Sequence, residues 1–292
     1  MKYGVLITAM VTPFKADTSV DFDKAAELAG KLVDNGSDGL VVTGTTGEST
    51  TLTMTESSEL YKVVMSAVGD RATVIAGSGS NSTAEAVQLT TAAEKAGVHA
   101  SLQVAPYYNK PSQEGFYRHF KTVAENTSLP LILYNIPGRT AKNVEAETII
   151  RLAEVDNIVG VKEASGDLEQ VSRIIRGAGS DFLVYSGDDF LTLPILALGG
   201  NGVISVASHV AGNEIKAMIE AFRAGEVKKA EQIHLRLMDL FKVLFITSNP
   251  VPVKAALRIT GFDAGGVRLP LVEATDGEKE KIAGVLKKLG MA

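Results

Sequence analysis

The stretch NIVGVKEASGD (residues 157–167) is the part of the sequence that best reveals how the chain is built. Ile158, Val159 and Val161 are typical of a buried strand, because β-branched residues favour strands. Lys162 follows them directly, so the sequence places an ammonium group at the end of an apolar strand.

Similar short, β-branched runs recur along the chain, separated by amphipathic helical patterns. They cover residues 4–14, 38–45, 73–79, 100–108, 129–136, 158–165, 182–189 and 202–208. Several are apolar without alternation, as expected for strands with both faces covered. The repeat is roughly 30 residues, which is the length of a βα unit. Eight such units predict a (β/α)8 TIM barrel.

A doubly wound open sheet is the alternative fold. It is expected to carry a glycine-rich nucleotide turn after its first strand, and TAMVTPFKAD is not such a turn. After the eighth strand only helical patterns follow. The sequence therefore predicts a barrel over residues 1–224 and a C-terminal helical region over residues 225–292.

The composition excludes several classes of protein and site. With 29 Lys+Arg against 34 Asp+Glu, the net charge is −5, which does not favour nucleic acid as a partner. No apolar run of 18 residues is present, so no membrane span is expected. The absence of cysteine excludes disulfides and thiolate metal ligands and fits a reducing cytoplasm. The four histidines are scattered, and no metal site is predicted.

Lys162 has two interpretations. It either extends to solvent or pairs with a carboxylate, as lysines commonly do, or it is a Schiff-base nucleophile. Burial among apolar residues would lower its pKa and give a neutral amine that attacks a ketone. Strand alternation places Gly160 on the same side as Lys162, and a glycine there would leave space for the long side chain and a ligand.

Tyr134 ends the preceding strand, about one repeat before Lys162. Neighbouring parallel strands lie about 4.8 Å apart, so the two side chains are expected to meet. The phenol is then either a proton relay or a packed tyrosine with a capped hydroxyl.

Three loops add polar and aromatic candidates. GTTGES (residues 44–49) is either a small anion nest or an ordinary Gly-Thr turn. Arg139 either binds a substrate carboxylate or forms a surface ion pair. The adjacent Tyr107 and Tyr108 indicate a subunit interface, a substrate lid or simple packing.

Taken together, GTTGES, APYYNKPSQEG, YNIPGRT, GVKEASGD and GGNGVISV resemble the dihydrodipicolinate synthase family of class I pyruvate-dependent aldolases. The resemblance spans residues 1–292 and implies a cytoplasmic homotetramer, a dimer of dimers, that acts in lysine and diaminopimelate biosynthesis. It implies pyruvate and aspartate 4-semialdehyde as substrates and no metal or organic cofactor.

The resemblance also implies roles for individual residues. The catalytic residues would be Lys162, Tyr134, Thr45 and Tyr108. The substrate-binding residues would be Thr46, Arg139, Ile204 and Gly187. In this assignment Lys162 forms the imine with pyruvate, and Tyr108 comes from a neighbouring subunit. Arg139 binds the carboxylate of the semialdehyde.

An allosteric lysine site is a further implication. The residues that match its pattern are Ser49, Asn81, Glu85 and Tyr107. Met54 and Ser57 depart from it, at positions where feedback-sensitive members often have histidines. The pattern therefore does not predict inhibition by L-lysine, and an assay with millimolar L-lysine would test it.

Two other functions fit parts of the same pattern. A sibling aldolase that cleaves N-acetylneuraminate or a 2-keto-3-deoxy sugar acid would also use Lys162 and Tyr134. A non-catalytic barrel that senses a keto acid would need no reactive amine. Borohydride treatment in the presence of pyruvate separates the enzymes from the sensor.

Overall fold

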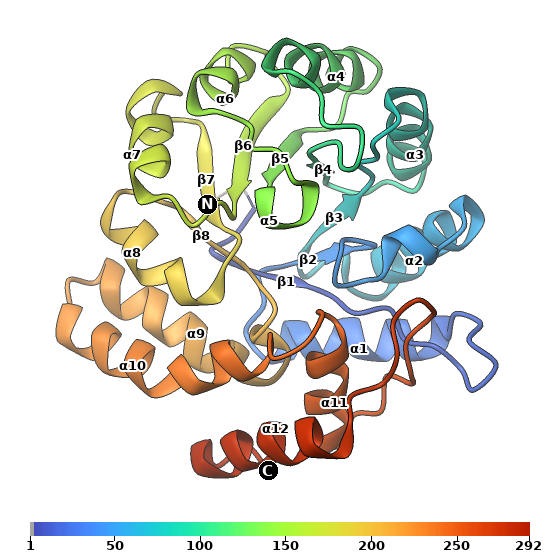
Figure 1. Ribbon diagram of the computed structural model, residues 1–292, viewed down its shortest axis with the longest axis vertical. Helices are drawn as coiled ribbons and strands as arrows, with labels where there is room; N and C mark the ends of the chain where they lie inside the picture. The colour runs from blue at the N-terminus through green and yellow to red at the C-terminus, as the bar shows by residue number, and fades with distance from the viewer. Residues whose placement is uncertain (1–2) are drawn as a thin grey trace.

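The computed structural model describes residues 3–292 and contains a closed barrel of eight parallel strands in chain order (Figure 1). The strands are β1 (Leu6–Ala9), β2 (Gly39–Val42), β3 (Thr73–Gly77), β4 (Ala100–Val104), β5 (Leu131–Asn135), β6 (Ile158–Glu163), β7 (Leu183–Ser186) and β8 (Gly202–Ser205). Because β1 pairs with β8 and closes the sheet, the predicted TIM barrel is confirmed and the open sheet is wrong.

Helices surround the barrel, as Figure 1 shows. They are α1 (Phe22–Asp34), α2 (Met54–Val68), α3 (Thr83–Lys95), α4 (Gln113–Glu125), α6 (Ala146–Leu152), α7 (Leu168–Gly177), α8 (Thr192–Ala197) and α9 (Ser208–Arg223). A short extra helix, α5 (Pro137–Thr140), follows β5 and carries Arg139 at the rim of the barrel.

Each strand divides its side chains between two layers. Ile132, Tyr134 and Tyr185 pack together inside the barrel, whereas Val161 packs into the layer between strands and helices. The strands are apolar on both sides because both layers exclude water, which explains the lack of alternation in their sequences.

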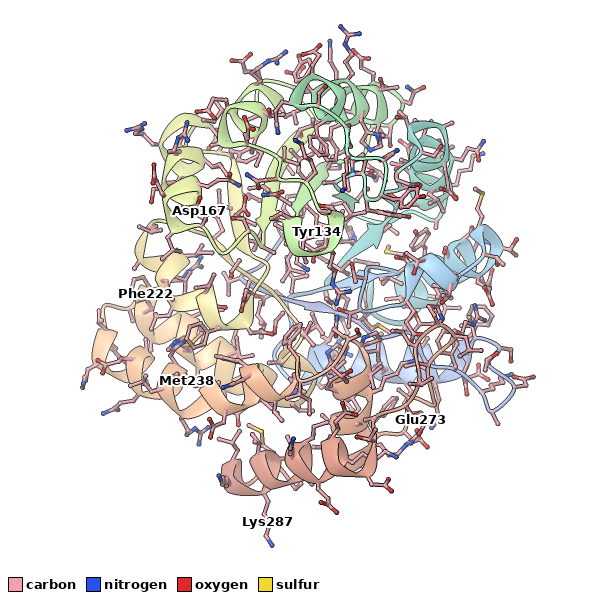
Figure 2. The ribbon with its side chains drawn as sticks, viewed as in Figure 1. Tyr134, Asp167, Phe222, Met238, Glu273 and Lys287 are labelled. Carbon is pink, nitrogen blue, oxygen red and sulfur yellow. The ribbon has the colours of Figure 1, made fainter. Side chains whose placement is uncertain are left out.

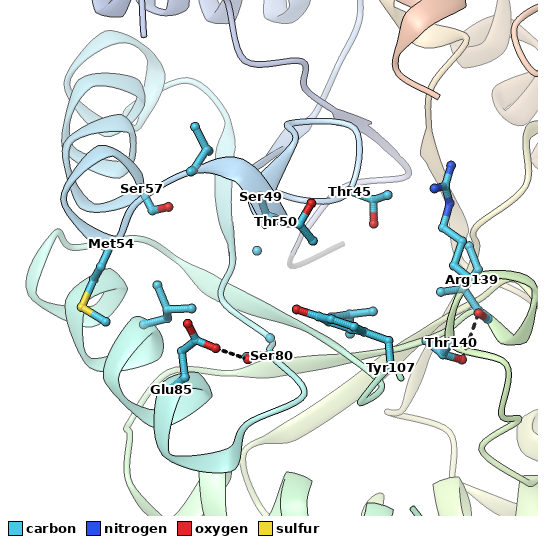
Figure 3. Close-up of a pocket in the computed structure, with 16 residues that line it drawn as sticks. Thr45, Ser49, Thr50, Met54, Ser57, Ser80, Glu85, Tyr107, Arg139 and Thr140 are labelled. Atoms are coloured by element: carbon cyan, nitrogen blue, oxygen red, sulfur yellow. Dashed lines mark hydrogen bonds between the residues drawn. The ribbon is translucent and has the colours of Figure 1, made fainter. Parts of the chain in front are cut away.

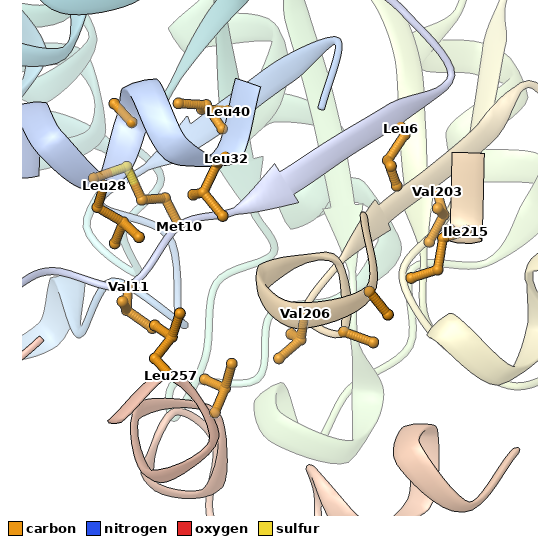
Figure 4. Close-up of a cluster of buried hydrophobic side chains, with 14 of the residues drawn as sticks. Leu6, Met10, Val11, Leu28, Leu32, Leu40, Val203, Val206, Ile215 and Leu257 are labelled. Atoms are coloured by element: carbon orange, nitrogen blue, oxygen red, sulfur yellow. The ribbon is translucent and has the colours of Figure 1, made fainter. Parts of the chain in front are cut away.

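Three further helices form the C-terminal helical region: α10 (Val227–Val243), α11 (Val251–Ile259) and α12 (Asp276–Leu289). Figure 1 shows α11 below α1, on one flank of the barrel, and α12 further out, where it packs against α10 and α11. Leu257 of α11 and Val11, which follows β1, belong to one hydrophobic cluster (Figure 4). The predicted division at residue 224 lies between α9 and α10 and stays a prediction.

In residues 3–292, helices long and apolar enough to cross a bilayer are absent.

Candidate active site

Lys162 and Tyr134 lie side by side near the C-terminal end of the barrel. They are register partners on β6 and β5, and the Lys162 Nζ lies 4.2 Å from the centroid of the Tyr134 ring. Tyr134 occupies the middle of the barrel in Figure 2. Both side chains are buried, at 6% and 5% exposure. The expected meeting of the two side chains is therefore confirmed.

The glycine two residues before Lys162 has a different role from the one expected. A Cβ at Gly160 would lie 2.5 Å from the Leu183 carbonyl oxygen and 2.9 Å from the Leu183 Cβ. The space is therefore occupied by β7, and Gly160 allows the close approach of that strand.

The buried environment of the Lys162 amine favours its neutral form. Burial lowers the pKa of Lys162 to about 8, although the negative charge of Asp189 opposes this shift and the positive charge of Arg139 reinforces it. Lys162 takes part in none of the ion pairs of residues 3–292, so its amine is not held charged by direct contact with a carboxylate. With a pKa of about 8, about a tenth of the amine is neutral at pH 7, far more than for a lysine in water.

Tyr134 is protonated over the physiological range. Burial raises the pKa of Tyr134 to about 12, against smaller opposing effects of Arg139 and of a hydrogen bond with the Thr45 side chain. A protonated phenol that is hydrogen-bonded to a second hydroxyl can pass a proton in either direction.

The GTTGES loop follows β2 and is tightly turned. Thr43 and Glu48 both have φ of 57°, an uncommon conformation for residues other than glycine. The Gly47 N–H donates to the Gly44 carbonyl at 3.0 Å, which closes the turn around Thr45 and Thr46. Thr46 is buried at 3% exposure, and its Oγ1 accepts a hydrogen bond of 2.8 Å from Asn249 Nδ2.

Two predicted substrate-binding residues lie on the last two strands: Gly187 directly follows β7, and Ile204 is in β8. A Cβ at Gly187 would lie 3.1 Å from the Lys162 Cε and 2.7 Å from the Ala164 Cβ, so only glycine fits beside the amine without a shift of its neighbours. Ile204 is buried inside the barrel in register with Ile7.

Asp189 is a buried carboxylate that the sequence analysis left without a role. It accepts hydrogen bonds from the backbone N–H groups of Val206 at 3.0 Å and Ala207 at 2.9 Å, and from the Ser205 hydroxyl. Burial raises the pKa of Asp189, while these donors favour its charged form. The sequence Gly-Asp-Asp (residues 187–189), directly after β7, was the only signal that pointed to it.

A cavity of about 340 Å³ opens beside this cluster. Its lining includes Thr45 and Arg139 from the predicted active site and Ser49, Glu85 and Tyr107 from the predicted allosteric site. Figure 3 shows Tyr107 between Arg139 on one side and Ser80 and Glu85 on the other.

Three of the four predicted allosteric residues, Ser49, Glu85 and Tyr107, thus line the same cavity, whereas Asn81 is not among its lining residues. The Ser80 hydroxyl donates to the Glu85 carboxylate, and the Asn81 carbonyl accepts a hydrogen bond of 2.8 Å from Asn109. Burial and the Glu85 charge raise the pKa of Tyr107. Met54 and Ser57, which depart from the feedback-sensitive pattern, line the cavity as well.

Tyr108 lies apart from the other predicted catalytic residues. It is 89% exposed, so its side chain makes little contact with its own chain, and its φ of 72° is uncommon for a residue other than glycine. Its assignment to the site of a neighbouring subunit stays a prediction.

The sequence analysis missed a buried ion pair behind the GTTGES loop. Lys254 Nζ lies 2.8 Å from Glu48 Oε1, with side-chain exposures of 4% and 2%. The only local signal was VPVKAAL (residues 251–257), in which a lysine again stands among apolar residues. Asn249, the hydrogen-bond donor to Thr46, had no signal of its own.

Comparison with known proteins identifies the family of the chain. The model of the Dihydrodipicolinate synthetase family matches residues 2–289. A 4-hydroxy-tetrahydrodipicolinate synthase from Moorella thermoacetica is 60% identical over 291 residues, which are 100% of both chains. A protein of the same name from Desulforamulus reducens is 57% identical, and the match covers 98% of this chain and 97% of that protein.

Solved structures give the same result. A crystal structure of DHDPS from Cyanidioschyzon merolae with lysine bound superposes with a TM-score of 0.98 at 52% identity. The match covers 100% of this chain and 99% of that one. The chain belongs to the dihydrodipicolinate synthetase family.

Proposed function

We propose that the chain condenses pyruvate with L-aspartate 4-semialdehyde, through a Schiff base on Lys162, to give 4-hydroxy-tetrahydrodipicolinate. The observation that carries the proposal is the buried, unpaired Lys162 amine against Tyr134. The name 4-hydroxy-tetrahydrodipicolinate synthase, borne by relatives over their full length, supports the choice of reaction.

The first half of the reaction forms the imine. The neutral Lys162 amine adds to the keto carbon of pyruvate, because a protonated amine has no free electron pair. Tyr134 and Thr45, which are hydrogen-bonded to each other, supply the proton that leaves with the hydroxyl as water. The protonated imine withdraws electrons from the neighbouring methyl group.

The second half forms the carbon–carbon bond and the ring. The methyl group loses a proton to the relay and the resulting enamine carbon attacks the aldehyde, whose oxygen becomes the hydroxyl. The amino group of the adduct then adds to the imine carbon and displaces Lys162. One water is released overall, and the imine nitrogen of the product comes from the semialdehyde. Hydroxyl groups serve every proton step, so the proposal assigns no metal or organic cofactor.

The two carboxylates of the substrates meet different groups. In the proposal, Thr46 and the main chain at Ile204 hold the carboxylate of pyruvate, beside the buried amine. Gly187 lets the backbone after β7 lie close to the Lys162 Cε, beside the proposed pyruvate site. Arg139 binds the carboxylate of the semialdehyde, since it is exposed and lines the open cavity.

The proposal extends to the assembly. Because Tyr108 is exposed and makes little contact with its own chain, we assign it to the proton relay of an adjoining subunit in a homotetramer, a dimer of dimers. Ser49, Asn81, Glu85 and Tyr107 form the proposed regulatory site. The biosynthetic reaction places the enzyme in the cytoplasm.

Borohydride trapping tests the proposal. Reduction in the presence of pyruvate should leave, on the peptide containing Lys162, a mass equal to pyruvate minus water plus two hydrogens. Lys254 is a matched internal control, because it is equally buried but bound to Glu48 and should stay unmodified. Absence of the adduct on Lys162 would refute the proposal. Turnover of an acylated sugar acid, without condensation with the semialdehyde, would favour a sibling aldolase.

A further inference from the structure

The GTTGES loop is held in place by residues that lie about 200 positions further along the chain. Asn249, just before α11, donates through Nδ2 to Thr46 Oγ1 at 2.8 Å, across a sequence separation of 203 residues. Both residues are buried, at 6% and 3% exposure. The contact is therefore shielded from competing water.

This hydrogen bond determines what the Thr46 hydroxyl can do. A threonine hydroxyl has one proton and two acceptor lone pairs. Since Asn249 Nδ2 occupies the oxygen as a donor, the proton of Thr46 stays available for another acceptor. A carboxylate is acceptor-only and suits that proton.

The orientation of the Asn249 amide has independent support. Asn249 Oδ1 is buried and lacks a hydrogen-bond partner within residues 3–292. With the amide reversed, Nδ2 would be the orphaned group, and buried orphan N–H donors are rarer than under-satisfied carbonyl oxygens. The arrangement with Asn249 as the donor is thus the more favourable one.

A second contact fixes the backbone beside Thr46. Glu48 has φ of 57° and accepts hydrogen bonds from Lys254 Nζ at 2.8 Å and from the Arg268 backbone N–H at 2.9 Å. Lys254 also donates to the Gly266 carbonyl at 2.6 Å. The C-terminal helical region therefore holds the loop at two points, the Thr46 hydroxyl and the Glu48 carboxylate.

We propose that Asn249 is a positioning residue for the keto acid: by donating to Thr46 Oγ1, it directs the Thr46 proton onto the substrate carboxylate. The inference rests on the proposed function and assigns to the C-terminal helical region a part in substrate binding. Asn249 does not touch the reacting atoms, so it acts through Thr46 alone.

Replacing the hydrogen-bond donor at Asn249 by an acceptor tests this role. In Asn249→Asp the carboxylate can only accept, so it takes the Thr46 proton and adds a negative charge beside the substrate carboxylate. We expect the pyruvate concentration for half-maximal borohydride trapping to rise by about tenfold or more. Asn249→Ala should raise it by a few-fold. The KM for the semialdehyde and the kcat at saturating pyruvate should stay within about threefold of wild type.

A double-mutant cycle separates this role from a purely structural one. Thr46→Val keeps the side-chain shape and removes the hydroxyl. If Asn249 acts through that hydroxyl, Asn249→Ala has no further effect on pyruvate half-saturation in the Thr46→Val background. Melting temperatures of all variants show whether the fold persists, and the cycle needs only the alanine variant if Asn249→Asp does not fold.

The possible failures are distinguishable. If wild type forms no adduct on Lys162, the proposed function is overturned and the inference with it. If wild type forms the adduct and folded Asn249 variants have the same pyruvate half-saturation, only the inference is overturned. Additive effects of Asn249→Ala and Thr46→Val would likewise overturn the inference alone.

Discussion

Lys162 Nζ lies 4.2 Å from the centroid of the Tyr134 ring because β5 and β6 are parallel neighbours that pair these two residues in register. On its other side, Lys162 pairs in register with Tyr185 of β7. Lys162 thus has a buried tyrosine as register partner on each neighbouring strand, and the two hydroxyls have different partners. Tyr134 hydrogen-bonds with Thr45 at the C-terminal end of the strands, and Tyr185 donates to the Gly4 carbonyl at 2.9 Å, just before β1.

This difference predicts opposite results for two conservative substitutions. Tyr134→Phe removes the proton relay, so kcat should fall by about 100-fold or more while the melting temperature changes little. Tyr185→Phe removes only a structural hydrogen bond and should lower the free energy of unfolding by about 1 kcal/mol with activity retained. Steady-state kinetics and denaturant unfolding of both variants give the comparison. Equal losses of kcat would contradict the assigned role of Tyr134.

The pH dependence of imine formation follows from the state of Lys162. Only the neutral amine attacks, and burial lowers the pKa of Lys162 to about 8. The rate of imine formation should therefore rise with pH through about 8 and level off above it, with about a tenfold loss per pH unit well below the pKa. Single-turnover trapping of pyruvate over a range of pH measures it. An inflection near the ordinary lysine pKa of 10.5 would show that the amine is not desolvated in solution.

Gly187 offers a steric test of the position of the Lys162 amine. In Gly187→Ala the new methyl would lie 3.1 Å from the Lys162 Cε and 2.7 Å from the Ala164 Cβ, so it displaces the amine or closes the pyruvate site. We expect kcat/KM for pyruvate to fall by about tenfold or more, since misplacement of about 1 Å can cost 100-fold. Gly284→Ala is the matched control, because a Cβ there meets nothing within 4 Å. Unchanged kinetics in Gly187→Ala would mean that the ends of β6 and β7 are looser than the structure has them.

The regulatory site gives a prediction about L-lysine. Glu85 can pair with an ammonium group, but Met54 offers no hydrogen-bond donor, and Ser57 is buried at 5% exposure. We therefore expect little inhibition by millimolar L-lysine, measured in a coupled assay at subsaturating pyruvate. Clear inhibition that disappears in Glu85→Gln would show that the site binds lysine without the two histidines.

Much of the fold was readable from the sequence because each strand is a local pattern. The eight β-branched runs predicted eight strands, and each run contains one strand of the barrel. The first run was too long, because β1 ends at Ala9. The Met10 N–H still donates to the Val41 carbonyl at 3.0 Å, but the side chains of Met10 and Val11 are buried in the layer outside the barrel. Apolar residues that pack under a loop resemble strand residues when only composition is considered.

For the functional residues, too, the local sequence predicts part of the result and distant contacts decide the rest. Lys162 follows VGV and Lys254 follows VPV, so the two lysines have nearly the same local sequence. One is a free amine on a strand, and the other is an ion-paired ammonium on α11. The difference is set by Glu48, which lies 206 positions away from Lys254 and could not be inferred from neighbouring residues.

The buried ion pair of Lys254 and Glu48 leads to the last prediction, which concerns the stability of the fold. In Lys254→Met the Glu48 carboxylate stays buried without its partner, so the free energy of unfolding should fall by about 3–5 kcal/mol. Adding Glu48→Gln removes the uncompensated charge and should restore a large part of the loss. Lys62→Met breaks an ion pair with Glu59 whose side chains are 59% and 46% exposed, and it should cost at most about 1 kcal/mol. Urea unfolding of the three variants gives the ranking. If Lys254→Met costs no more than Lys62→Met, the ion pair is hydrated in solution and does not hold the GTTGES loop.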